Sequence, residues 1–248
     1  MPEQSQKVRS SRPLKLYAVA VTAIMLLILA AFLVVFTHAG YHTKVLVKLG
    51  LKEPVVKTNH ALLAWENCLE KLDYDADVVF FGDSITYQSD FQHPGLKIVN
   101  LGYSGDTLSG MTGRIPMVQA VNPEKVFVLG GINGLTDANL SQTADLYENL
   151  LDQLQQALPE TKIYVQSVLP IAKEREATLT NICHNETIVA FNEQLEEMAA
   201  QRGLTYIDIH SLYYCDGQLD PTMTSDGLHL EPHAYEKWEA AIKPYLDE

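Results

Sequence analysis

The stretch that decides the fold is Val78–Thr86, which reads Val-Val-Phe-Phe-Gly-Asp-Ser-Ile-Thr. Its four consecutive apolar residues predict a buried strand, because the run is too short to form a helix by itself. Gly82 ends the run, and Ser84 follows two residues later. A serine just beyond the carboxyl end of a parallel strand lies where open α/β sheets bind ligands. Ser84 is therefore a candidate nucleophile, and the alternative is that it caps the next helix.

The far end of the chain supplies a candidate base for this serine. Asp226 and His229 are three residues apart in the segment Asp-Gly-Leu-His. In a tight turn that spacing brings both side chains to one side, so the carboxylate can accept from one imidazole nitrogen while the other faces Ser84. An alcohol needs such a base, and the base needs a group that orients it. The sequence therefore predicts a triad of Ser84, His229 and Asp226, and the alternative is a solvated surface turn.

Two further segments, taken with these, resemble the SGNH (GDSL-type) hydrolase family of esterases and acylhydrolases. The four blocks that carry the family's Ser, Gly, Asn and His resemble, in order, Gly82–Ser84, Asn100–Thr107, Leu129–Asn133 and Asp226–His229. Each block is weak alone, but the ordered set is specific. Many members have Asp after the third-block Asn, whereas this chain has Gly134. We expect that difference to change hydrogen bonding in the loop and to leave the Asn itself little affected.

The resemblance implies three hydrogen-bond donors for the oxyanion that forms during ester hydrolysis. They are the backbone N–H of Ser84, the backbone N–H of Gly105 and the side-chain amide of Asn133. A glycine lets the backbone approach a substrate closely, and an asparagine donates without carrying charge. Taken alone, Gly105 and Asn133 are equally compatible with ordinary turns. The competing α/β-hydrolase elbow requires G-x-S-x-G, and Thr86 stands where its second glycine would be.

From Val78 onward, strand and helix patterns alternate, which predicts a parallel sheet with helices on both faces. With the resemblance, this is a three-layer α/β/α sandwich around a mostly parallel, five-stranded, flavodoxin-like sheet. The candidate strands are Val78–Phe81, Lys97–Leu101, Lys125–Leu129, Lys162–Ser167 and Thr205–Asp208. The candidate helices are Ala61–Leu72, Leu108–Val121 (broken or short because of Pro116), Ser141–Leu158, His184–Arg202 and Pro232–Tyr245. We expect the loops Pro170–Asn181 and Ser211–Ser225 to shape the substrate pocket.

The N-terminal part predicts a membrane anchor. Residues 1–15 hold four basic residues and one acid, and Leu16–Phe36 contains no charged residue. About twenty apolar residues suffice to cross a bilayer, and the basic flank should stay in the cytoplasm. We therefore expect a basic tail (1–15), a transmembrane helix (16–36), a linker (37–60) and an extracytoplasmic hydrolase domain (61–248). The alternative is a signal peptide cleaved near Ala30-Ala31.

The amino-acid composition limits the kinds of partner that the sequence predicts for this protein. The formal net charge of −13 over 248 residues argues against nucleic acid, which selects a basic face. Outside the cytoplasm, Cys183 and Cys215 could form a disulfide, and the alternative is two unpaired thiols. His229 and His233 have a zinc-chelating spacing, but Pro232 lies between them and no third ligand is evident, so we predict no metal.

The leading hypothesis is a single-pass membrane protein whose extracytoplasmic domain is a serine esterase. It would hydrolyse small or short-chain acyl esters, on lipid or carbohydrate, through an acyl-enzyme and without a cofactor. An acyltransferase moving the acyl group to or from an envelope glycan would use the same residues. A third alternative is a non-catalytic surface binding module. The oligomeric state stays open.

Overall fold

The structure is a computed structural model that describes Met25 and residues 75–176 and 182–248. The chain divides into two units, Met1–Asn59 and His60–Glu248, and the sheet and its helices belong to the second. The predicted basic tail, linker and first helix lie outside the described residues. Of the predicted membrane span 16–36, only Met25 is described, as a helical residue with an exposed side chain.

Within the described ranges, no helix has the length and hydrophobicity that a membrane crossing requires.

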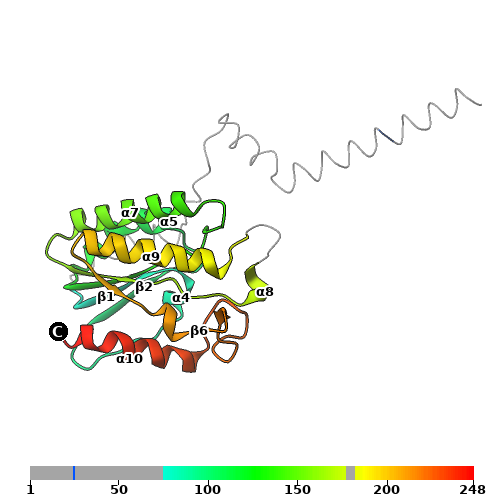
Figure 1. Cartoon of the computed structure of the whole chain (residues 1–248). Coiled ribbons are helices and arrows are strands. Elements are labelled where there is room, and N and C mark those ends of the chain that lie inside the picture. The colour runs from blue at the N-terminus through cyan, green and yellow to red at the C-terminus, as the bar shows by residue number, and fades with distance from the viewer. Residues whose placement is uncertain (1–24, 26–74, 177–181) are drawn as a thin grey trace, which may run out of the picture. The chain divides into compact units, whose positions relative to one another are not determined.

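The central sheet has five parallel strands, as predicted, and their order is β2-β1-β3-β4-β5 (Figure 1). The strands are β1 (Val78–Gly82), β2 (Ile98–Gly102), β3 (Lys125–Leu129), β4 (Lys162–Gln166) and β5 (Thr205–Ile207). Gly82, at the end of β1, pairs with Gly102 of β2 and with Leu129 of β3. Because the strand order reverses beside β1, the carboxyl end of this strand lies at the point where doubly wound sheets bind ligands.

Helices cover both faces of the sheet. The helices are α4 (Ser84–Tyr87), α5 (Leu108–Gly113), α6 (Ile115–Ala120), α7 (Leu140–Ala157), α8 (Lys173–Glu176), α9 (Asn185–Gln201) and α10 (Tyr235–Leu246). Short 3-10 turns, η1 (His210–Leu212) and η2 (Pro232–Ala234), follow β5 and precede α10. Figure 1 shows α5, α7 and α9 on one face and α10 on the other, which is the predicted three-layer arrangement.

The hydrophobic core lies in two layers, one on each side of the sheet. Val79 and Phe81 of β1 pack with the residues of α7 and α9, whereas Val78 and Phe80 pack with α10. All four are fully or almost fully buried. A strand buried on both faces needs apolar side chains at every position, which is why β1 reads as an unbroken apolar run.

The segment that follows the second block, Leu108–Val121, was predicted as a broken or short helix and contains two helices. The predicted helix Leu108–Val121 is two helices, α5 and α6, which meet at Arg114. Pro116 lies in the first turn of α6, where the missing N–H has no helical partner to lose. The break that Pro116 predicted is therefore confirmed, and it places Arg114 at the junction.

A short hairpin lies within the predicted loop Ser211–Ser225. Its strands are β6 (Tyr214–Cys215) and β7 (Gln218–Leu219), joined by Asp216 and Gly217 with φ of +49° and +80°. Two consecutive residues with positive φ are typical of the tight turns that Asp-Gly favours in hairpins. Cys215 is exposed on β6 while Cys183 is buried, and both thiols are free, so the disulfide hypothesis is wrong.

Candidate active site

Ser84 is the first residue of α4, and Asp83 rather than Ser84 caps this helix. The Asp83 carboxylate accepts a hydrogen bond from the Ile85 N–H at 3.0 Å. The capping alternative for Ser84 is therefore wrong, and its hydroxyl is left to face another partner. Gly82 is required at the preceding turn, because a Cβ there would collide with the Thr86 side chain and the Leu129 carbonyl.

The structure brings Ser84, His229 and Asp226 together in one line of contacts. The His229 Nε2 lies 2.9 Å from the Ser84 Oγ, and the His229 Nδ1 lies 2.7 Å from the Asp226 Oδ2. The other carboxylate oxygen of Asp226 accepts from the backbone N–H groups of Leu228 (2.9 Å) and His229 (2.8 Å). Two backbone donors on one oxygen fix the carboxylate, so its second oxygen is presented to the imidazole.

Asp226 stays ionised throughout the physiological range. Partial burial alone would raise its pKa, but hydrogen bonds from the His229 ring and from the His229 and Leu228 N–H groups hold the pKa far below its usual value. Arg175 of α8 adds a positive charge, with Nη2 3.6 Å from the carboxylate and Nε bonded to the Asp226 carbonyl. A fixed carboxylate of this kind can stabilise an imidazolium. Sequence reasoning missed Arg175, because its segment shows no periodic pattern.

The candidate oxyanion donors all have unused N–H groups. Gly105 has φ of +73°, a conformation that favours glycine. The Asn133 side-chain amide donates one hydrogen bond, to the Asp106 carbonyl at 2.9 Å, and an amide has two N–H bonds. Among the described residues, no acceptor takes the backbone N–H of Ser84 or of Gly105. Asn133 and the segment that carries Gly105 are thus in direct contact.

Asp83, next to Ser84, is a buried acid whose protonation state the sequence did not reveal. The residue is completely buried, and its Oδ2 has no hydrogen-bond partner among the described residues. Burial, opposed by the Ile85 N–H and reinforced by the negative charge of Asp106, raises the pKa of Asp83 to about 7. The side chain is therefore neutral over much of the acidic range.

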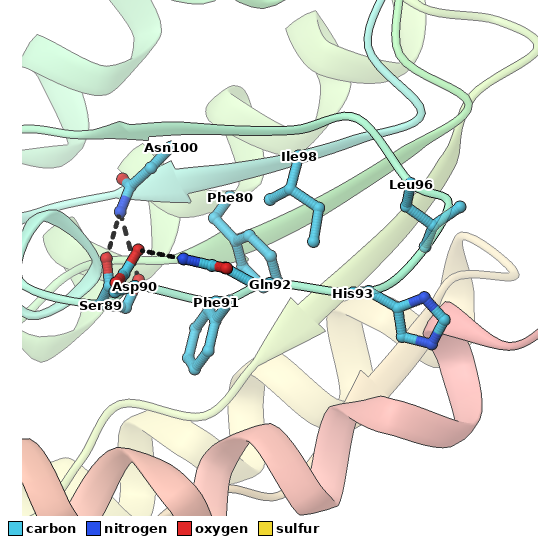
Figure 2. Close-up of a pocket in the computed structure, with 9 residues that line it drawn as sticks. All are labelled: Phe80, Ser89, Asp90, Phe91, Gln92, His93, Leu96, Ile98 and Asn100. Carbon is cyan, nitrogen blue, oxygen red and sulfur yellow. Dashed lines mark hydrogen bonds between the residues drawn. The ribbon is translucent and has the colours of Figure 1, made fainter.

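Asn100 of the second block holds the residues that follow the nucleophile. Its amide nitrogen donates to the carbonyls of Thr86 (2.8 Å) and Ser89 (3.0 Å), which fastens the end of α4 to the edge strand β2. Figure 2 shows Asn100 and Ser89 at one end of a cavity of about 370 Å³, with Phe80 and Phe91 among its lining residues. None of the three predicted triad residues lines this cavity.

The two loops predicted to shape the pocket meet beside Asp226. Ala172 and Arg175 from the first loop, and Thr224 and Ser225 from the second, line a cavity of about 330 Å³ that Asp226 also lines. The first loop is tied to the catalytic turn directly, because the Ala172 N–H donates to the Gly227 carbonyl at 2.9 Å. The Nε2 of His233, the residue whose spacing from His229 could suit zinc, lies 3.1 Å from the Thr222 carbonyl oxygen.

The parallel sheet and the contacts between a serine, a histidine and a carboxylate are those expected from the family that the four blocks resemble. Residues 80–237 match the GDSL-like Lipase/Acylhydrolase family. The chain therefore belongs to that family, as its four blocks predicted.

Three similar proteins illustrate the range of relatives. The chain is 26% identical over 175 residues to an N-acylneuraminate cytidylyltransferase of Streptococcus agalactiae serotype V, covering 70% of this chain and 40% of the relative. It therefore spans less than half the length of that relative. It is 28% identical over 202 residues to the isoamyl acetate-hydrolyzing esterase 1 homolog of Rattus norvegicus, covering 68% of this chain and 81% of the relative. A GDSL-like lipase from Bacteroides thetaiotaomicron shares the fold, with a TM-score of 0.60, 21% identity, and coverage of 75% and 97%.

Proposed function

We propose that the protein is a serine esterase in which Ser84 attacks the ester carbonyl and the His229 Nε2 takes the serine proton. The N–H groups of Ser84, Gly105 and the Asn133 amide hold the oxyanion. Collapse of the tetrahedral intermediate expels the alcohol, which receives the proton from His229, and leaves an acyl group on Ser84. A water molecule that His229 deprotonates then releases the acid and frees the serine. Asp226 keeps the imidazole in the tautomer that these steps need.

One observation carries this proposal: the unbroken line of contacts from the Ser84 Oγ through both ring nitrogens of His229 to the Asp226 carboxylate, at 2.9 and 2.7 Å. A base in contact with the hydroxyl, itself oriented by a third group, is the arrangement that activates an alcohol.

The proposed substrates are small or short-chain acyl esters, carried on lipid or carbohydrate. The rat relative is named for an acetate ester, which supports a short acyl group. The streptococcal relative is named for an N-acylneuraminate, a sugar whose N-acyl group is an amide, so its name supports a carbohydrate substrate but no particular ester. The proposed location is the outer face of a membrane, and the uncharged segment Leu16–Phe36 behind a basic tail supports it.

The catalytic proposal is tested with Ser84→Ala and a series of p-nitrophenyl esters of increasing chain length. We expect the parent to prefer acetate or butyrate, and a fluorophosphonate probe to label the parent and not the variant. The matched control is Ser89→Ala, five residues after Ser84, which should be labelled like the parent. Hydrolysis by Ser84→Ala at the parent rate contradicts the mechanism.

The location is tested separately, in intact cells that express the full chain with a C-terminal tag. We expect the tag to remain in the membrane fraction after carbonate extraction and to be digested by external protease. A tag that is extracted, or that is protected until the cells are lysed, contradicts the anchor or its orientation.

A further inference from the structure

Arg114 is a buried cation that the proposed mechanism does not use. It lies where α5 and α6 meet, and its side chain is only 4% exposed. Its guanidinium lies over the rings of Phe81 (4.9 Å to the centroid) and Tyr103 (5.7 Å). A buried charge is costly unless it is paired and hydrogen-bonded, so the partners of this group indicate what it is for.

The guanidinium of Arg114 bonds three separate segments of the chain. Nε (2.8 Å) and Nη2 donate to the Oδ2 of Asp106, the residue after Gly105. Nη2 also donates to the Gly82 carbonyl at the end of β1 (3.0 Å), and Nη1 to the Leu101 carbonyl on β2 (2.8 Å). One planar group with five N–H donors therefore holds the ends of two strands and the loop that follows β2.

Two of these three segments carry proposed oxyanion donors. Ser84 follows the bonded Gly82 by two residues, and Gly105 directly precedes the bonded Asp106. The third donor is tied to the same group at one remove, because the Asn133 amide donates to the Asp106 carbonyl at 2.9 Å. The relative positions of all three donors thus depend on one ion pair.

We propose that Arg114 is a positioning residue of the oxyanion hole. It touches no reacting atom; it fixes the spacing of the Ser84, Gly105 and Asn133 donors through Gly82 and Asp106. The inference rests on the proposed function, since it assigns those three donors to the oxyanion. A merely structural ion pair is the competing explanation. Buried pairs of that kind are often replaceable by apolar residues without loss of stability, so stability alone does not account for this one.

Helix α5 offers a second way to disturb the same ion pair without touching Arg114. A Cβ on Gly110 would collide with the Asp106 Oδ1, whereas a Cβ on Gly113 of the same helix meets nothing within 4 Å. Helix propensity alone favours alanine over glycine at both positions. Gly110→Ala and Gly113→Ala are therefore matched variants that differ in whether they push the Asp106 carboxylate.

The experiment compares Arg114→Lys, Gly110→Ala and Gly113→Ala with the parent on p-nitrophenyl acetate. Lysine keeps a positive charge but is a point donor that cannot span the three acceptors of the guanidinium. Active sites are counted by end-point labelling with a fluorophosphonate, and kcat is expressed per labelled site. A residue that only supports the fold changes the number of sites and the Tm, and leaves kcat per site unchanged.

We expect kcat per site to fall about 10- to 100-fold in Arg114→Lys and Gly110→Ala, with KM within about threefold of the parent. Gly113→Ala should match the parent. Parent-like kcat per site in both test variants, or a rise in KM with unchanged kcat, overturns the inference. If Arg114→Lys does not fold, Gly110→Ala against Gly113→Ala decides alone. A parent that shows no Ser84-dependent hydrolysis refutes the proposed function and this inference together, whereas an active parent with unaffected variants refutes only the latter.

Discussion

Replacing Asp226 by asparagine changes one atom of the site, and the structure fixes which way the new amide must point. The Oδ1 of Asp226 accepts from two backbone N–H groups, those of Leu228 and His229. Only an oxygen can accept there, so the amide oxygen takes this position. The amide nitrogen is then placed 2.7 Å from the His229 Nδ1, where the parent has Oδ2. The opposite orientation would set an N–H against two N–H donors and lose both hydrogen bonds, at a cost of about 2–3 kcal/mol.

An N–H donor in that place forces the wrong tautomer of the imidazole. The His229 Nδ1 must accept, so the ring proton moves to Nε2, which lies 2.9 Å from the Ser84 Oγ. A protonated Nε2 cannot take the serine proton. The same exchange in a serine protease triad lowers kcat by about 10⁴, and we expect a loss of roughly 10³ to 10⁴ here. At about 1.4 kcal/mol per factor of ten, this corresponds to about 4–5.5 kcal/mol of activation free energy.

The assay is kcat for p-nitrophenyl acetate, corrected for the fraction of folded protein from its thermal transition. Asp220→Asn is the matched control. The Asp220 carboxylate also accepts a hydrogen bond from a backbone N–H two residues later, that of Thr222 at 2.9 Å, and no imidazole of the described residues is hydrogen-bonded to it. We expect this control to keep the parent rate. An Asp226→Asn enzyme that is folded and retains more than a tenth of the parent kcat would refute the tautomer argument, and with it the role given to Asp226.

Three further predictions concern stability and reactivity. Burial raises the pKa of Asp83 to about 7, so the folded chain holds a proton that the unfolded chain releases, and this group should lower the free energy of unfolding by about 4 kcal/mol as the pH rises from about 4 to about 7. Asp83→Asn should remove that pH dependence, as measured by urea titrations at a series of pH values. The same change of stability with pH in both proteins would contradict the prediction. An alanine at Gly227 combines φ of +78° with a Cβ 2.8 Å from a neighbouring methyl group, whereas an alanine at Gly217, with φ of +80°, meets no atom within 4 Å. Gly227→Ala should therefore lower the free energy of unfolding by at least about 1 kcal/mol more than Gly217→Ala does, as measured by urea titration. Equal losses of stability would count against the close packing at Gly227. Burial, with the nearby acids Asp137 and Glu176, raises the pKa of the Cys183 thiol to about 12, while Cys215 is exposed. Iodoacetamide at pH 8 should therefore label Cys215 and not Cys183 in folded protein, as read by peptide mapping. Labelling of Cys183 at a rate similar to that of Cys215 would show that its site is open.

The sheet could be predicted because burial on both faces leaves a strong signal. Strands β1 and β3 each contain an unbroken apolar run, Val78–Phe81 and Val126–Leu129, and each predicted strand lies within a residue or so of its observed bounds. The chemistry-bearing residues could be predicted because four short blocks stand in a fixed order, and Ser84, His229 and Asp226 do lie in contact. Both predictions rest on patterns that are local in the sequence.

What escaped prediction depends on contacts between distant segments. Arg114 lies in a stretch of helical pattern, and an arginine there is typical of a solvated face; only the fold shows that it is buried against Asp106. Arg175 lies in a segment without periodicity, so its contact with Asp226 left no trace in the sequence. The hairpin did have a local signal, the Asp216-Gly217 pair, but flanking strands of two residues are too short to show alternation.

Tyr235 joins the last helix, α10, to the short helix α4 that begins with Ser84. Its buried hydroxyl donates a hydrogen bond to the Ile85 carbonyl of α4. Trp238, one turn further along α10 and completely buried, donates to the Gln166 side chain at the end of β4. Under the proposed function, ester cleavage during refolding requires that α10 has docked, because Tyr235 of this helix bonds the segment that carries Ser84. Recovery of turnover would therefore report the docking of α10, whereas the far-ultraviolet signal reports helix formation in the chain as a whole.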